Sequence, residues 1–205
     1  MARPREFDEA TVLDAAVQCF WSRGYEATSM RDLIEETGLT GASLYNAFGD
    51  KRALYQRALD RYVAGTIADR IRRCEAMPPR EAIRTFFAEV LKRSLTDPEH
   101  KGCMLVNAAL DVVPRDRALQ KDVAEILATI ERFFRASAER GQADGSITRT
   151  QSATNLARHL LGVLMGIRVL ARARPEKALL EGIVASAMSF LESEHSGSAG
   201  RHCGR

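Results

Sequence analysis

TSMRDLIEETGLTGASLYNAFGDKRAL, residues 28–54, is the stretch that decides the fold of this chain. Ser29 and Thr40 are residue types that cap helix N-termini, because their hydroxyls accept a hydrogen bond from a backbone N–H of the first turn. Gly38 suits the end of the helix between them, since the left-handed position after a helix prefers glycine. Apolar residues recur at helical spacing on either side. The stretch therefore predicts a helix-turn-helix over about residues 29–48.

The second helix of this pair has an outer face of small and polar side chains. Leu44, Ala47 and Phe48 fall on its inner face, which predicts packing against the first helix and against a helix over about residues 8–22. An α-helix fits the major groove of DNA, and short side chains let it approach the base edges closely. We therefore predict sequence-specific DNA binding, in which the carboxamide of Asn46 suits an adenine edge. The residues predicted to meet or approach base edges are Thr40, Gly41, Ala42, Ser43 and Asn46.

Net charge gives the prediction of DNA binding little support. The whole chain carries a formal charge of +3, but residues 1–60 contain seven Arg or Lys against ten Asp or Glu. Affinity must therefore come from individually placed contacts to phosphates, and we expect non-specific binding to be weak. The predicted phosphate contacts are Arg3 and Arg5 on an N-terminal arm, Thr28, Ser29, Arg31, Tyr45, Lys51 and Arg52.

Residues 24–54, GYEATSMRDLIEETGLTGASLYNAFGDKRAL, resemble the N-terminal DNA-binding domain of the TetR/AcrR family of bacterial transcriptional regulators. Three positions depart from the family pattern: Gly41 stands where Lys is frequent, Asn46 where His is common, and Ile34 where a small Ala is usual. The first two departures leave the operator sequence open, and the third changes the packing between helices. The matching positions are Gly24, Tyr25, Thr28, Ser29, Met30, Asp32, Leu33, Gly38, Leu39, Thr40, Leu44, Tyr45, Phe48, Lys51, Ala53 and Leu54.

The rest of the chain predicts further helices separated by Pro- and Gly-containing loops. Helix-forming residues dominate the composition, alternating β-branched runs are few, and 45% of the residues are hydrophobic. We therefore expect an all-α fold of about nine helices, with a three-helix DNA-binding domain over residues 1–50 and a helical ligand-binding and dimerisation domain over residues 51–192. Residues 193–205 are Gly/Ser-rich and predict a disordered tail. The helices expected beyond the first domain cover about residues 51–77, 80–95, 102–113, 115–140, 151–173 and 176–192.

The last two predicted helices, 151–173 and 176–192, carry apolar residues on more than one face. Such helices need partners on more than one face, which either the centre of a monomeric bundle or a dimer interface provides. The resemblance implies the second arrangement, a homodimer formed through these two helices as a four-helix bundle. A two-fold dimer presents two helix-turn-helix units to a palindromic operator in double-stranded DNA.

The resemblance also implies a small apolar or amphipathic effector bound among the middle helices. A Phe or Met at helical spacing fits a plain hydrophobic core equally well. Asn107 and Arg168 are more telling, because polar groups on otherwise apolar faces need partners. The candidate ligand-binding residues are Phe86, Phe87, Cys103, Met104, Asn107, Leu110, Phe133, Phe134, Leu164, Met165 and Arg168.

Cys103 starts a short apolar helix, and His100 and Lys101 precede it. A helix N-terminus and nearby cations lower the pKa of a thiol and raise its reactivity, whereas a cysteine that begins a buried helix is often an inert packing residue. The segment GCMLVNAALDV, residues 102–112, resembles a branch of the family in which a cysteine here responds to electrophiles or oxidants. Cys19 falls on a buried stripe and Cys203 in the tail, so neither is a candidate sensor.

Known catalytic motifs are absent from the sequence, including a nucleophile elbow, a phosphate-binding glycine loop, a dinucleotide fingerprint and a zinc-protease helix. We expect no cofactor and no metal, because the histidines and cysteines lack ligand spacing. A long apolar span and a signal segment are also absent, which predicts a bacterial cytoplasmic protein. The favoured function is a repressor released by a ligand or an electrophile. The alternatives are a helical adaptor with a vestigial DNA-binding motif and a thiol-dependent enzyme that uses Cys103.

Overall fold

The computed structural model describes residues 7–192, which form helices joined by loops and contain no strand. A π-helical turn, η1 (Ala64–Ala68), joins α4 to α5, and a short 3₁₀ turn, η2 (Val113–Arg115), precedes α8. Because α4, η1 and α5 form one continuous rod, the predicted all-α fold of about nine helices is confirmed. The α-helices are α1 (Glu9–Arg23), α2 (Met30–Thr37), α3 (Gly41–Phe48), α4 (Lys51–Val63), α5 (Asp69–Glu75), α6 (Pro79–Thr96), α7 (Met104–Asp111), α8 (Arg117–Asp144), α9 (Ala153–Ala173) and α10 (Lys177–Ser189).

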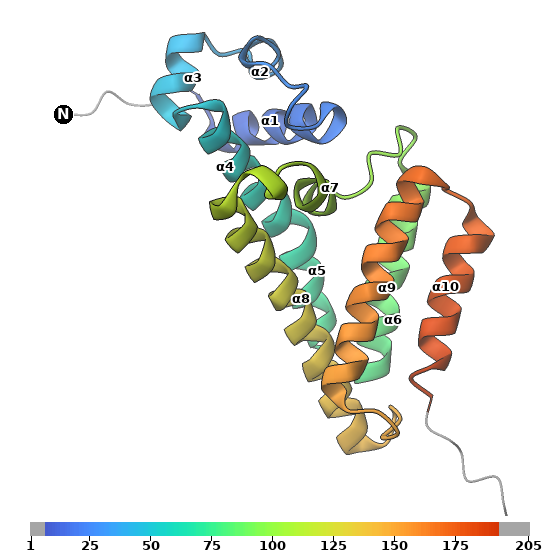
Figure 1. Cartoon of the computed structure of the whole chain (residues 1–205). Coiled ribbons are helices and arrows are strands. Elements are labelled where there is room, and N and C mark those ends of the chain that lie inside the picture. The colour runs from blue at the N-terminus through green and yellow to red at the C-terminus, as the bar shows by residue number, and fades with distance from the viewer. Residues whose placement is uncertain (1–6, 193–205) are drawn as a thin grey trace, which may run out of the picture.

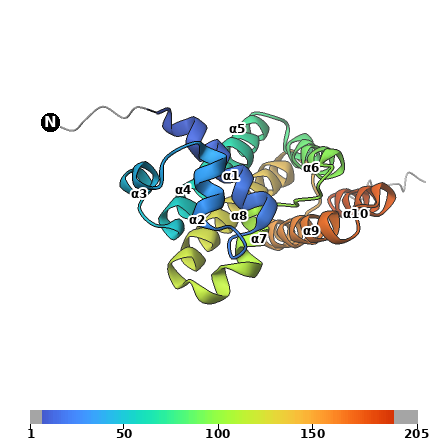
Figure 2. The ribbon, with the colours of Figure 1, turned by 90° about the horizontal axis from the view of Figure 1, so that it is seen from above.

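Helices α1 to α3 pack together at one end of the molecule, and we call this unit the head (Figure 1). The α4–α5 rod leads from the head into the larger part of the molecule, where it runs beside α8 (Figure 1). Seen from above, the head covers α4 and α8, whereas α9 and α10 lie to one side of it (Figure 2). Within residues 7–192, no helix has the length and apolar character that a membrane span requires.

Local capping fixes the two helices of the helix-turn-helix. The Ser29 hydroxyl accepts a hydrogen bond from the Asp32 N–H at 3.2 Å, and the Asp32 carboxylate accepts one from the Ser29 N–H at 2.7 Å. Gly38 has a φ of 68°, so the first helix ends at a left-handed glycine. The Thr40 hydroxyl accepts from the Ser43 N–H at 3.2 Å and starts α3. These predicted caps are confirmed.

Aromatic side chains join the head to the rod. Phe20 on α1 meets Tyr55 on α4 with ring centroids 5.0 Å apart, and Trp21 meets Tyr62 at 5.3 Å, both edge to face. All four rings are buried. Burial of one such side chain contributes about 1.5–3 kcal/mol, so these pairs hold α1 firmly on the rod.

Two predicted helix boundaries are wrong. The helix expected to stop at Gly141 continues to Asp144, and Gly145, with a φ of 81°, ends it. Gly141 is buried within α8, where a Cβ would lie 2.5 Å from two carbons of Ile147. This glycine therefore allows close packing and does not stop the helix. The helix expected from residue 102 begins at Met104, because Cys103 occupies its N-cap.

Candidate nucleic-acid interface and effector cavity

The outer face of α3 has the composition that the sequence predicts. Leu44 is fully buried and Phe48 is 5% exposed, so the inner face of this helix is fixed against the rest of the head. Tyr45 is 52% exposed, and Ala42 and Asn46 are also exposed. The helix therefore presents a short, weakly charged surface that fits closely into a major groove.

Gly41 at the start of α3 is coupled to Ile34 on α2. A Cβ at position 41 would lie 3.2 Å from Ile34 Cδ1, which is closer than ordinary van der Waals contact. Both residues are departures from the family pattern, and the sequence alone gave no reason to connect them. The larger Ile34 fills the space that a side chain at position 41 would use.

The predicted phosphate contacts differ in exposure. Thr28 is 1% exposed and donates its hydroxyl to the Gly24 carbonyl at 2.7 Å, so its side chain supports the loop before α2. Ser29 and Arg31 are exposed at the start of α2. Lys51 lies 4.4 Å from the centre of the Tyr25 ring. Arg3 and Arg5 lie outside the described residues.

The N-terminus of the rod is tied to α8. Arg52 Nε donates to Asp116 Oδ2 at 2.5 Å and Arg52 Nη2 donates to Asp116 Oδ1 at 3.0 Å, which is a bidentate ion pair. Asp116 is also the N-cap of α8 and accepts from the N–H groups of Ala118 and Leu119. The Arg52 hydrogen bond, followed by the backbone donors, lowers the pKa of Asp116 to about 2.

The other side of the rod is tied to α1. Arg61 donates from Nε and from Nη2 to the two oxygens of the Asp14 carboxylate, each at 2.8 Å, and Arg57 pairs with Glu9. Together with the Arg52 pair, these contacts connect α4 both to the head and to α8.

Five of the predicted ligand-binding residues converge on one buried cavity. Its volume is about 10 Å³, which is room for one water-sized group. Arg70 on α5 also lines it, and sequence reasoning missed this residue. A signal was present, because Arg70 falls within the buried helical stripe of Ile67, Ile71 and Cys74. The cavity is lined by Ile67, Arg70, Phe86, Cys103, Leu105, Ile130, Leu164, Met165 and Arg168.

Four phenylalanines beside this cavity form an aromatic cluster. Phe86 stacks on Phe133 with centroids 5.4 Å apart, and Phe87 stacks on Phe134 at 5.6 Å. All four rings are at most 3% exposed. Phe86 alone of the four lines the cavity, so the other three serve as the core behind it.

Three further ligand candidates do not line this cavity, and Leu110 is the most exposed of them. Leu110 is 62% exposed, because it falls on the solvent side of α7. Met104 is 1% exposed and packs in the core. Asn107 donates its amide to the Lys101 carbonyl at 3.0 Å, and this bond fixes the loop before α7.

Cys103 is buried and in contact with the rod. Its sulfur accepts a hydrogen bond from the Tyr62 hydroxyl at 3.6 Å, and burial raises the pKa of Tyr62, so this donor stays protonated. The Lys101 ammonium pairs with Glu99 at 3.2 Å and lies 4.9 Å from the Trp21 ring. The expected cation beside the thiol is therefore engaged with other partners.

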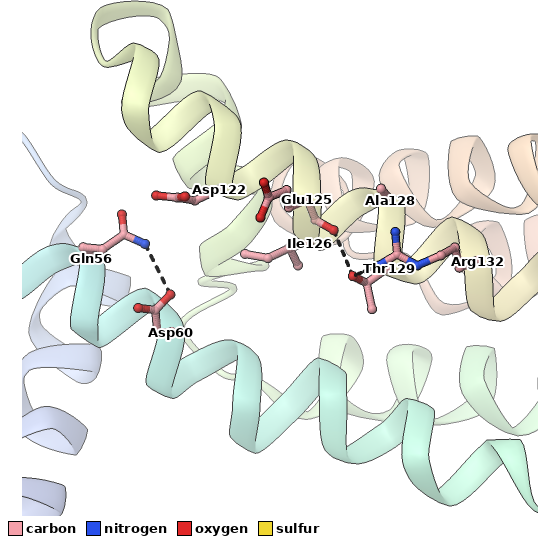
Figure 3. Close-up of a pocket in the computed structure, with 8 residues that line it drawn as sticks. All are labelled: Gln56, Asp60, Asp122, Glu125, Ile126, Ala128, Thr129 and Arg132. Carbon is pink, nitrogen blue, oxygen red and sulfur yellow. Dashed lines mark hydrogen bonds between the residues drawn. The ribbon is translucent and has the colours of Figure 1, made fainter.

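A larger cleft lies between α4 and α8, and none of the predicted ligand-binding residues lines it. Figure 3 shows Gln56 and Asp60 on α4 opposite Asp122, Glu125 and Ile126 on α8. Its volume is about 550 Å³, and it is open to solvent. Because water hydrates the carboxylates of an open cleft, they need no ligand.

An apolar groove lies between α9 and α10, on the helices predicted to dimerise. Its volume is about 430 Å³. Phe190, which follows α10, is 47% exposed, and its ring centroid lies 4.8 Å from that of His159 in the groove. Gly162 and Gly182 have open space above them. The groove is lined by His159, Val163, Ala178, Leu179, Gly182, Ile183, Ser186 and Ala187.

Comparison with known proteins identifies the family. Residues 12–58 match the profile of the bacterial regulatory proteins of the tetR family, and residues 79–187 match the tetracyclin repressor-like C-terminal domain. The chain belongs to the TetR family. It is therefore a DNA-binding transcriptional regulator and not an enzyme, and neither alternative predicted from the sequence finds support.

Relatives of this TetR-family chain match it over nearly its whole length. The uncharacterized HTH-type transcriptional regulator YezE of Bacillus subtilis is 32% identical over 94% of the chain and 100% of its own length. The HTH-type transcriptional repressor ComR of Escherichia coli is 31% identical over 92% of the chain and 90% of its own length. Both matches include the head and the helices around the cavity.

A solved structure of another TetR-family regulator has the same fold. A cysteine mutant of CifR, complexed with 26-bp double-strand operator DNA, superposes with a TM-score of 0.82 at 32% identity. The superposition covers 93% of this chain and 100% of the CifR chain.

Proposed function

We propose that the protein is a repressor that binds a palindromic operator as a homodimer and leaves it when an effector binds. The observation that carries the proposal is the outer face of α3, where Tyr45 and Asn46 are exposed above a buried Leu44. Two comparisons support this proposal. The relative ComR is named as a repressor, and the CifR mutant is complexed with operator DNA. Because its target is chromosomal DNA, we place the protein in the bacterial cytoplasm.

Base edges are the proposed targets of α3 and its cap. Asn46 provides the specific contact, because its carboxamide can donate to and accept from adenine together. Ser29, Arg31, Tyr45 and Lys51 position the head on phosphates, and Thr28 contributes only through its backbone. We propose residues 1–50 as the DNA-binding domain and 51–192 as the effector and dimerisation domain. The residues proposed to approach bases are Thr40, Gly41, Ala42, Ser43 and Asn46.

We propose that the dimer forms through the groove between α9 and α10. Its apolar lining and the half-exposed Phe190 leave a surface that a second copy would cover. A two-fold axis here places both heads on the same side of the dimer. The spacing of the two heads then depends on the angle of each rod.

The α4–α5 rod links the cavity to the head, and it provides the route by which an effector releases the protein from its operator. An effector in the cavity displaces α5, which carries Arg70, and the rod transmits the displacement to the head. The effector then favours a conformation in which the two heads no longer fit adjacent major grooves. Cys103 lines the same cavity, so an electrophile that reaches its sulfur would have the same effect.

The test is the selection of bound fragments from the chromosome of the source organism, followed by binding isotherms at 50–200 mM salt. We expect one or a few palindromic fragments to be retained and the affinity to fall steeply with salt. Asn46→Ala should lose about 1–3 kcal/mol of discrimination for each head. The matched control is Lys92→Ala on α6, an exposed residue outside the head. A monomeric protein that retains no fragment at low ionic strength contradicts the proposal.

A further inference from the structure

Two guanidinium groups are buried together at the effector cavity. Arg70 on α5 is 4% exposed and Arg168 on α9 is 5% exposed. The two residues line the same cavity, and the charge of Arg168 acts on Arg70. Burial, and then this repulsion, lower the pKa of Arg70. Arginine nevertheless remains protonated in proteins, so both positive charges persist.

The charges around the cavity do not balance. Arg70 Nε lies 3.1 Å from Glu89 Oε2, but the same oxygen also lies 2.6 Å from Arg73 Nη2. Arg168 donates from Nη1 to the Ser94 hydroxyl at 3.1 Å, which is a neutral partner. Among residues 7–192, no carboxylate lies within salt-bridge distance of Arg168. Glu89 thus compensates Arg70 and is shared with Arg73, which also pairs with Asp69, and within the described part of the chain Arg168 has no counter-ion.

An uncompensated guanidinium in a protein interior is costly. A buried charge is stable when a counter-ion and hydrogen bonds replace the water that it loses. A guanidinium has five N–H donors, and the one that Arg168 donates to Ser94 meets a hydroxyl, which replaces a hydrogen bond and no charge. An apolar residue would fill this position on α9 at a lower cost, so packing does not explain the arginine. A monoanion would restore both the charge balance and the hydrogen bonds.

The remaining lining shows what else the anion carries. Ile67, Leu105 and Leu164 are apolar, and the Phe86 ring lies 5.3 Å below the Arg70 guanidinium. Because the cavity holds only about 10 Å³, any ligand larger than a water molecule must push the surrounding helices apart. Arg70 lies two residues after η1, a π-helical turn of the kind often found at functional sites. The rod therefore has an irregular turn next to the residue that a ligand would displace.

We propose that the effector is an organic monocarboxylate with an apolar body, whose carboxylate pairs with Arg168 and Arg70. This inference rests on the proposed function, because it names the chemical class of the effector. The carboxylate supplies the missing counter-ion, and the body of the ligand spreads between the apolar side chains of η1, α6 and α9. The resulting displacement of α5 turns the rod and its head.

The test compares acids with matched neutral and cationic ligands on the full-length protein. The probes are hexanoate, octanoate and phenylacetate, each beside the corresponding alcohol and amine, with binding measured by isothermal titration calorimetry. We expect at least one acid to bind about 10-fold or more tightly than its alcohol, because charge-assisted hydrogen bonds are strong. Binding of no acid, or equal binding of acid and alcohol, overturns the proposal.

Substitution of Arg168 tests whether its charge recognises the carboxylate of the ligand or whether its side chain only fills space. Arg168→Met keeps an unbranched side chain, although a shorter one, and removes its charge, and we expect it to bind an acid and its alcohol equally. Arg84→Met, which neutralises an exposed arginine on α6, should keep the preference for the acid. A preference that survives in Arg168→Met overturns the proposal. Should that variant fail to fold, the ranking of acid, alcohol and amine by the wild-type protein decides the question.

Operator binding is also measured in the absence of the acids, alcohols and amines. This measurement distinguishes failure of the proposed repressor function from failure of the proposed carboxylate effector. Calorimetry of the acids needs no DNA, so a preference for acids without operator binding would contradict the proposed function alone. Operator binding with no preference for acids would contradict this inference alone.

Discussion

The contact between Gly41 and Ile34 yields a quantitative prediction about the helix-turn-helix. Gly41→Ala removes the conformational freedom of a glycine in the first turn of α3, which is worth up to about 1 kcal/mol. The new Cβ lies 3.2 Å from Ile34 Cδ1, so the isoleucine must leave its rotamer at a cost of about 0.5–1.5 kcal/mol. The two terms nearly cancel, and we expect the single substitution to leave the free energy of unfolding almost unchanged.

Truncation of Ile34 should reveal the stabilisation that an alanine at position 41 provides when nothing crowds its Cβ. In an Ile34→Ala background the contact is gone, so Gly41→Ala should stabilise the protein by up to about 1 kcal/mol. The double-mutant cycle then gives a coupling energy of about 0.5–1.5 kcal/mol. The assay is urea unfolding of the wild type, both single variants and the double variant at one protein concentration. Additivity within about 0.3 kcal/mol would refute the reasoning, because it would mean that the two side chains do not compete for space.

Two further predictions concern the rod and the cavity. The pKa of Asp116 lies at about 2 in the folded protein, below its ordinary value of 3.8, so its stabilising effect is complete above pH 4 and is lost as the pH falls towards 2. Asp116→Asn should therefore show a smaller loss of melting temperature than the wild type between pH 4 and pH 2, and parallel melting curves would contradict the role of the Arg52 pair. Cys103→Ser should keep operator binding but no longer be released by an alkylating agent in a gel-shift assay. Release of that variant at the wild-type rate would assign Cys103 to packing.

The head could be predicted from the sequence because its determinants are local. Ser29, Gly38 and Thr40 act on backbone groups within a few residues, and capping preferences encode such contacts directly. The apolar spacing of α3 likewise decides which side is buried, since a helix repeats every 3.6 residues. The exposed face with Asn46 follows from the same spacing.

Sequence patterns failed where a distant residue decides the role of a near one. Gly141 has the composition of a helix stop, but Ile147 packs against it and the helix continues. Thr28 resembles a phosphate ligand, yet its side chain is buried against the loop. Leu110 has the character of a core residue and lies on the solvent side of α7. Periodicity defines the faces of a helix, but it does not say which neighbour covers them.

The sequence by itself determined the helices of the head, their caps and the outward face of α3, because these depend on contacts within a few residues. Only the tertiary structure decided that Ile34 occupies the space beside Gly41, and that Glu89 is shared by Arg70 and Arg73 while Arg168 has a serine for its partner. The physical reason is that charge balance and packing volume are properties of several helices brought together. A helix pattern records which residues are apolar, and the fold determines which charges meet.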